Sequence, residues 1–189
     1  KDLPLFGVVS RLYHQKGLDL LTSILKKLLE SNTAQFIILG SGSSEEEGNF
    51  SKLAGKFPHN LGLKIGFDDQ LARRIFAGTD FFIMPSRFEP CGLAQQYAMR
   101  YGSVLVARDT GGLSDTIISQ KNCSLRANGY LFKGLTPKSL LHELNTAIND
   151  WAEQKNYLHL QKNAMNLDCS WESAAKKYLD VYQWSLGNP

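Results

Sequence analysis

A carboxylate stands on a turn of this sequence where a strand is expected to pass into a helix. Glu89 lies in the segment Pro-Ser-Arg-Phe-Glu-Pro-Cys-Gly-Leu, residues 85–93, directly after the apolar run 80–84. That run is typical of a buried parallel strand, and residues 92–101 have a helical pattern. In open α/β sheets, ligands bind at the carboxyl edge where such turns lie. Glu89 can therefore hold a sugar hydroxyl while free N–H groups at the helix start bind a phosphate.

Two cations flank the loop that follows the first expected strand. Arg11 and Lys16 are suited to binding a diphosphate, because positive side chains neutralise it and arginine can contact two oxygens at once. Ordinary surface cations would have the same spacing. From the residues alone, both interpretations remain open.

Three other side chains near strand ends have competing interpretations. Phe67 follows the third expected strand, where its ring can stack on a nucleobase or belong to the core. Glu89 either binds a sugar hydroxyl or serves only as a cap of the following helix. Cys91 is either a small buried residue near the ligand or a thiol made more reactive by the helix start.

Two glycine-containing turns also follow strands. Residues 40–42 read Gly-Ser-Gly, which does not complete the dinucleotide-binding fingerprint and is interpreted as part of a cleft wall. Thr110, Gly111 and Gly112 follow the fifth strand, and the glycines allow backbone to approach a ligand closely. A plain turn with a helix cap would also explain these three residues.

The elements that must position these residues alternate along the chain. Repeated β-α-β units predict an α/β fold with a doubly wound parallel sheet, right-handed crossovers and a helical C-terminal extension. Apolar residues recur with a helical period from Leu18 to Leu29, and a further helix is expected to start near the glutamates of residues 45–47. Strands are expected over residues 5–10, 35–39, 61–65, 80–84, 104–107 and 130–132, and further helices over 69–77, 137–151, 154–166 and 171–184.

Composition narrows the function classes. The chain has 189 residues, 43% of them hydrophobic, and a formal net charge of +3. Without runs of like charge or a long apolar segment, neither nucleic acid nor a membrane is an expected partner. The cysteines at positions 91, 123 and 169 lack metal-ligand spacing, so we expect no metal site and reduced thiols in a cytosolic or stromal compartment.

The segment 85–93, followed by Tyr-Ala-Met-Arg-Tyr-Gly at residues 97–102, resembles the donor-binding signature of bacterial glycogen synthases and plant starch synthases. These are retaining glucosyltransferases of the GT-B architecture, whose C-terminal half is a Rossmann-like domain. The resemblance extends from about Pro4 to about Tyr182. Where many other retaining GT-B enzymes carry a second glutamate after Glu89, this chain has Tyr97, as in the glycogen synthase branch.

The resemblance implies a role for each candidate residue. Arg11 and Lys16 would offset charge on the donor phosphates, and Glu89 would orient the donor glucose, so these three are the expected catalytic residues. Phe67 would stack on adenine. Ala94 stands where the family often has threonine, which removes one hydroxyl and leaves the backbone N–H. The remaining expected donor contacts are Cys91, Gly92, Leu93, Thr110, Gly111 and Gly112.

The resemblance also implies an activity and partners. The intact enzyme would transfer glucose from ADP-glucose to an α-1,4-glucan, without a cofactor, in the cytoplasm or in a plastid. Residues 1–167 would bind the donor, and residues 168–189 would form a helix crossing to an N-terminal domain that carries the acceptor site. This fragment alone should fold but have little activity. The alternatives are an enzyme that uses a UDP-sugar and a non-catalytic nucleotide- or glucan-binding module.

Overall fold

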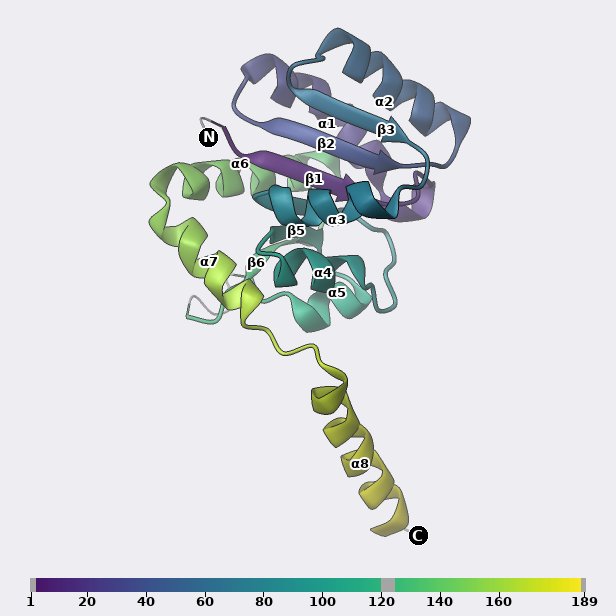
Figure 1. Ribbon diagram of the computed structural model, residues 1–189, viewed down its shortest axis with the longest axis vertical. Helices are drawn as coiled ribbons and strands as arrows, with labels where there is room; N and C mark the ends of the chain where they lie inside the picture. The colour runs from purple at the N-terminus through teal and green to yellow at the C-terminus, as the bar shows by residue number, and fades with distance from the viewer. Residues whose placement is uncertain (1–2, 120–124, 188–189) are drawn as a thin grey trace.

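The chain folds around one parallel sheet with helices on both faces (Figure 1). The computed structural model describes residues 3–119 and 125–187, so Cys123 lies outside the described residues. The sheet has six strands in the order β3-β2-β1-β4-β5-β6, and every pairing between neighbours is parallel. The strands are β1 (Leu5–Val9), β2 (Gln35–Gly40), β3 (Leu61–Ile65), β4 (Phe81–Met84), β5 (Val104–Arg108) and β6 (Gly129–Phe132).

The expected α/β fold with a doubly wound parallel sheet is confirmed, and each expected strand lies within one residue of its position at both ends. The sheet order reverses between β1 and β4, which are adjacent although β2 and β3 intervene in sequence. The helices are α1 (Leu18–Ser31), α2 (Ser44–Lys56), α3 (Asp69–Gly78), α4 (Ala94–Arg100), α5 (Gly111–Thr116), α6 (Pro137–Glu153), α7 (Lys155–Met165) and α8 (Trp171–Gly187), with a 3-10 turn, η1 (His14–Lys16).

Alternating strand residues supply two apolar layers, one on each face of the sheet. On one face Phe6 stacks between Phe36 and Phe81, and α1, α2 and α6 cover this layer. On the other face Phe82 packs against Phe76 of α3, together with α4 and α5. Because the central strands are buried on both faces, their sequences are continuous apolar runs. Packing on both faces keeps the ends of these strands in fixed positions.

The helix after β4 begins later than the sequence pattern predicts. It was expected from Gly92, but α4 begins at Ala94, with Leu93 as its N-cap residue. Gly92 has a φ of 72°, in the left-handed region that glycine adopts readily, so it cannot be part of a right-handed helix. The segment from Pro85 to Leu93 is therefore a longer non-helical loop than predicted.

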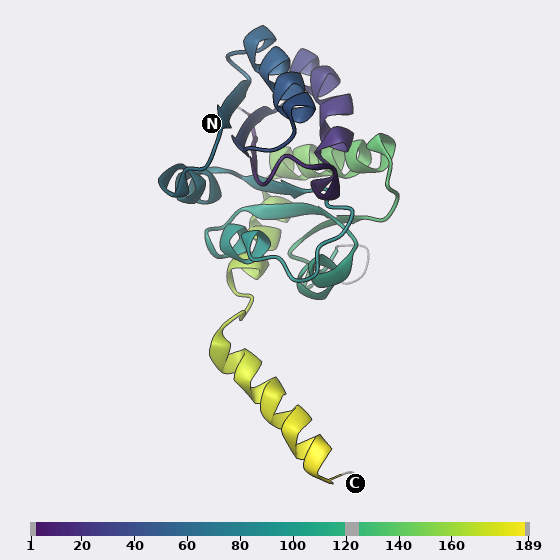
Figure 2. The same cartoon turned by 90° about the vertical axis from the view of Figure 1, so that its right-hand side faces the viewer.

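The last helix, α8, extends away from the sheet domain (Figures 1 and 2). Ser170 caps it, since its hydroxyl accepts a hydrogen bond from the Ser173 N–H at 3.2 Å. None of the helix residues is buried. The exposed large side chains of this helix are Trp171, Tyr178, Leu179, Val181, Tyr182, Trp184 and Leu186.

Candidate functional site

A cavity of about 170 Å³ opens at the carboxyl ends of β1 and β4, the point where the strand order reverses. Ligands in doubly wound sheets bind in the crevice at such a switch point. Six of the residues singled out in the sequence line this one cavity, although they come from two segments far apart in the chain. These residues are Arg11, Lys16, Glu89, Gly92, Leu93 and Ala94.

The centre of the cavity is an ion pair between the two segments. The Lys16 ammonium donates to Glu89 Oε2 at 2.6 Å, and the Ser86 hydroxyl donates to the same oxygen at 3.1 Å. Glu89 is only 5% exposed, so its carboxylate is placed by protein groups instead of by water. The interpretation of Glu89 as no more than a helix cap is wrong, because Leu93 occupies the N-cap position.

Arg11 lies beside this pair and is exposed. Among residues 3–119 and 125–187, its guanidinium has no ion-pair or hydrogen-bond partner, in contrast to Lys16. A free cation next to a paired one is suited to receiving an anionic ligand, since no existing bond must first be broken.

A second cavity, of about 230 Å³, adjoins the first one through Val9, Ser10 and Arg11. Phe67 lines it and is 93% exposed, so the alternative of a core phenylalanine is wrong. Gly40 and Ser41 line the same cavity, as expected for a cleft wall. The exposed Phe67 ring and Glu89 thus line adjoining cavities, and Arg11 lines both of them.

The glycines of this cleft bring backbones together. A Cβ on Gly111 would lie 2.2 Å from the carbonyl oxygen of Glu89, and one on Gly112 would lie 2.3 Å from that of Cys91. The Gly112 N–H also donates to the Glu89 carbonyl at 3.0 Å. Gly111, Gly112 and the preceding Thr110 are absent from the lining of both cavities. The glycines lie against the loop that carries Glu89, and direct contact of these three residues with a donor stays a prediction.

Cys91 is exposed and free, so the expectation of a small buried residue is wrong. Cys91 lies three residues before the first residue of α4, Ala94, and not directly before the helix as predicted. Its carbonyl accepts a hydrogen bond from Gln95 Nε2 at 2.7 Å, and that glutamine is fully buried. Sequence reasoning missed Gln95, because a glutamine within a helical pattern carries no local signal of a tertiary contact.

The ion-pair partner of Arg87 was also not predictable from the sequence. Its guanidinium forms a bidentate ion pair with Asp19, with Nη1–Oδ1 at 2.6 Å and Nη2–Oδ2 at 2.7 Å. The hydrogen bond from Arg87 lowers the pKa of the Asp19 carboxyl, whereas burial and the Asp19 charge raise the pKa of the neighbouring Glu46. Asp19 lies in the first turn of α1, where sequence alone indicates only a favourable helix dipole.

Acidification should therefore weaken the fold partly through Asp19. Its folded-state pKa is lower than its unfolded pKa, so its stabilising contribution is complete above the unfolded pKa and is lost as pH falls through the folded pKa. Glu46 acts in the opposite direction, because its raised pKa favours the folded state on protonation. Urea unfolding midpoints between pH 6 and pH 2.5 should fall less steeply for Asp19→Asn than for the wild type, and equal slopes would contradict the assignment.

Within the described ranges, no group of three or more histidine, cysteine, aspartate or glutamate residues could hold a metal ion. In the same part of the chain, none of the helices has both the length and the apolar character needed to cross a bilayer.

Comparisons with known proteins all match this chain to glycosyl transferases. The family model described as "Glycosyl transferases group 1" matches residues 1–166. The chain is 42% identical over 187 residues to a glycogen synthase of Kosmotoga olearia, covering 99% of this chain and 39% of that protein. It is 46% identical over 185 residues to a glycogen synthase of Dechloromonas aromatica, covering 96% and 38%.

A solved structure extends the comparison to the fold. The catalytic domain of starch synthase IV from Arabidopsis thaliana, bound to ADP and acarbose, matches with a TM-score of 0.87 and 34% identity. The match covers 100% of this chain and 39% of that one. The chain therefore spans about two fifths of the length of the relatives that it resembles.

Proposed function

The chain belongs to the group 1 family of glycosyl transferases, and from this premise we propose that it forms the donor-binding part of a glycogen synthase. The longer enzyme would transfer glucose from ADP-glucose to the non-reducing 4-hydroxyl of an α-1,4-glucan, with retention of configuration. Its activity would lie in the cytoplasm, or in a plastid if the source is a plant. The similarity to glycogen synthases over nearly the whole chain supports this substrate class.

The observation that carries the proposal is the single cavity lined by Arg11, Lys16, Glu89 and the segment Gly92–Ala94. In the reaction the bond between glucose and the diphosphate breaks, ADP leaves, and the acceptor hydroxyl bonds to the same sugar carbon as it loses its proton. Arg11 and Lys16 would stabilise the negative charge that grows on the departing diphosphate. Glu89 would orient the glucose ring through its hydroxyl groups.

The domain assignment belongs to the same proposal. Residues 1–167 would bind the donor, and α8 would cross to an N-terminal domain that supplies the glucan acceptor site. The many exposed aromatic and aliphatic side chains on α8 support a packing role, because large exposed apolar patches mark interaction surfaces.

Glucan elongation by the full-length protein tests the proposed function. Incorporation of glucose from ADP-glucose into an α-1,4-glucan, with UDP-glucose as the competing donor, is the decisive measurement. Elongation that prefers ADP-glucose is the expected result. A preference for UDP-glucose would show that the donor is a UDP-sugar. Binding of ADP without any transfer would point to a non-catalytic module.

Phe67 provides a separate test of the nucleoside subsite. Because its ring is 93% exposed beside Arg11, we expect Phe67→Ala to weaken ADP binding by about 1–3 kcal/mol, the range for stacking of a base on an aromatic ring. Phe67→Tyr retains the stacking face and should bind as the wild type does. The measurement is calorimetric titration of the full-length protein with ADP.

The matched control is Leu158→Ala, which removes another exposed apolar side chain, on α7 and outside the lining of both cavities. It should leave ADP affinity unchanged. If Phe67→Ala and Leu158→Ala bind ADP equally well, Phe67 does not contact the base.

A further inference from the structure

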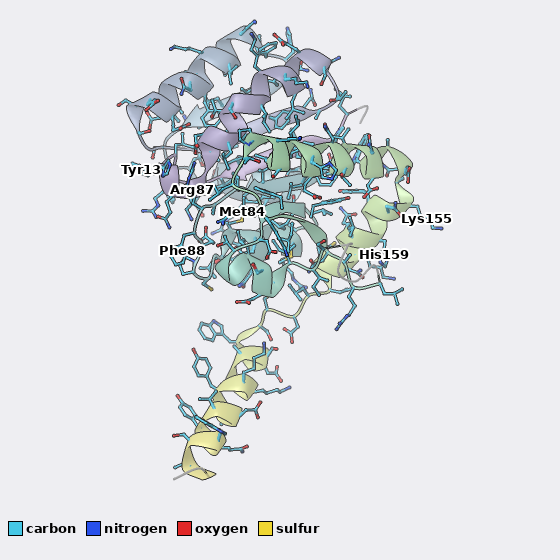
Figure 3. All side chains as sticks on the ribbon, turned by 180° about the vertical axis from the view of Figure 1, so that it is seen from behind. Tyr13, Met84, Arg87, Phe88, Lys155 and His159 are labelled. Atoms are coloured by element: carbon cyan, nitrogen blue, oxygen red, sulfur yellow. The ribbon has the colours of Figure 1, made fainter. Side chains whose placement is uncertain are left out.

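Arg87 is a cation of the Glu89 loop that the proposed chemistry does not use. An arginine two residues before Glu89, beside a cavity suited to a diphosphate, would be expected to face the ligand. Instead it is absent from the lining of that cavity, and its guanidinium lies against α1 and η1. Figure 3 shows Arg87 at the edge of the domain near Tyr13 and Phe88.

The contacts of Arg87 are specific to a planar guanidinium. Two parallel hydrogen bonds join it to the Asp19 carboxylate at 2.6 and 2.7 Å, and a third reaches the His14 carbonyl at 2.7 Å. The exposed fractions of the two side chains are 22% for Arg87 and 36% for Asp19, so the pair is partly shielded from water. A lysine could supply the charge here but not the fork of donors.

This ion pair runs beside the one between Lys16 and Glu89. Asp19 follows Lys16 at the start of α1, and Arg87 precedes Glu89 in its loop, so the same two segments are joined twice. Backbone bonds add to the link, since the Arg87 N–H donates to the Gln15 carbonyl at 2.8 Å. Arg87 therefore joins the segment of Lys16 to the loop of Glu89 through both its side chain and its backbone.

Arg108, at the end of β5, supports the same loop from the sheet. Its Nη1 donates to the Ser86 carbonyl at 3.4 Å and also to the carbonyl of Arg87. The Glu89 loop is thus fixed to the sheet on one side and to α1 on the other. Of these two attachments, only the one to α1 also fixes the loop that carries Lys16.

We infer that Arg87 and Asp19 form a positioning pair, which holds the Lys16 and Glu89 side chains at the separation needed for glucosyl transfer. This inference rests on the proposed function. Neither residue lines the cavity proposed for the donor. The pair acts on the reaction by fixing two groups that do, and a displacement of about 1 Å in such groups can lower a rate by about 10²-fold.

The test is the substitution Arg87→Lys in the full-length enzyme, with kcat and KM measured for ADP-glucose. We expect kcat to fall by about 10- to 100-fold while KM changes by less than about threefold, because charge is kept and geometry is lost. Asp19→Asn, which is nearly isosteric, should lower kcat in the same way. The thermal unfolding midpoint of each variant separates this loss from incomplete folding.

The matched control is Arg73→Lys, because Arg73 forms an ion pair with Asp69 that is exposed on both sides. It should retain wild-type kcat. The reversed pair, Asp19→Arg with Arg87→Asp, should recover part of the kcat lost in Asp19→Arg alone. Wild-type kcat in Arg87→Lys, or a loss that merely follows the unfolded fraction, would overturn the inference.

A failure of the proposed function is distinguishable from a failure of this inference. If the full-length protein does not elongate glucan, the coupling between Arg87→Lys and Lys16→Ala can still be measured in calorimetric binding of ADP. A non-additive effect of the two substitutions would support the positioning pair. Strict additivity would refute it whatever the protein transfers.

Discussion

Replacing Lys16 with alanine in the full-length enzyme should lower kcat/KM for ADP-glucose by about 10²- to 10³-fold, the loss typical of removing one preorganised group that stabilises charge in a transition state. Lys16 lines the central cavity, and its ammonium lies 2.6 Å from Glu89 Oε2. The substitution removes a cation from the expected site of the departing diphosphate. It also leaves the Glu89 carboxylate without its ionic partner.

The same substitution should destabilise the protein, because breaking a buried ion pair by removing one partner costs about 3–5 kcal/mol. The side chains of Lys16 and Glu89 are only 18% and 7% exposed. Adding Glu89→Gln to Lys16→Ala should recover much of the unfolding midpoint, since the unpaired charge is gone. It should not recover kcat/KM, because both functional groups are then missing.

Lys26→Ala is the matched control, because Lys26 lies in α1 and its contact with Glu30 is 3.9 Å long and exposed. It should change neither kcat/KM nor the unfolding midpoint measurably. Steady-state kinetics and thermal unfolding on the same preparations make the comparison. If Lys16→Ala retains the kcat/KM of Lys26→Ala, Lys16 has no part in the transfer.

Gly17→Ala should damage both the fold and the site. A Cβ at this position would lie 2.0 Å from the carbonyl oxygen of Pro85, and the φ of Gly17 is 65°. Left-handed backbone costs a non-glycine residue about 1–2 kcal/mol, and overpacking adds about 1–3 kcal/mol. We therefore expect a loss of about 2–5 kcal/mol in the free energy of unfolding.

The effect on the site follows from the two segments that meet at this contact. Gly17 directly follows Lys16, and Pro85 begins the loop that carries Glu89, so any relief of the clash separates the two loops. ADP binding by the folded fraction should be weakened as well. Gly48→Ala is the control, because Gly48 is inside α2 with nothing within 4 Å of an added Cβ.

Gly48→Ala should raise the free energy of unfolding by about 0.5–1 kcal/mol, since alanine favours a helix over glycine. Urea unfolding of both variants gives the comparison. Equal midpoints for Gly17→Ala and the wild type would mean that Gly17 and Pro85 are farther apart than the structure places them.

The sequence alone determined the local part of this molecule. Continuous apolar runs mark the buried strands and a period-3.6 apolar pattern marks the helices, and the strands lie within one residue of their expected bounds. The cap at Ser170 is equally local, since its hydrogen bond joins residues three positions apart. The position of Glu89 on a strand-end turn followed from the apolar run before it and the helical pattern after it.

Only the tertiary structure decided which side chains meet. Lys16 and Glu89 are 73 positions apart, and they touch because the sheet places β1 beside β4. Local patterns do not encode that adjacency, since the same β-α-β repeats are compatible with several strand orders. The ion pair of Arg87 with Asp19 could not be predicted from the sequence for the same physical reason. The same holds for the close contact of Gly111 and Gly112 with the Glu89 loop. Ion pairing and close backbone contact depend on distances in space, and a sequence specifies those distances only through the fold.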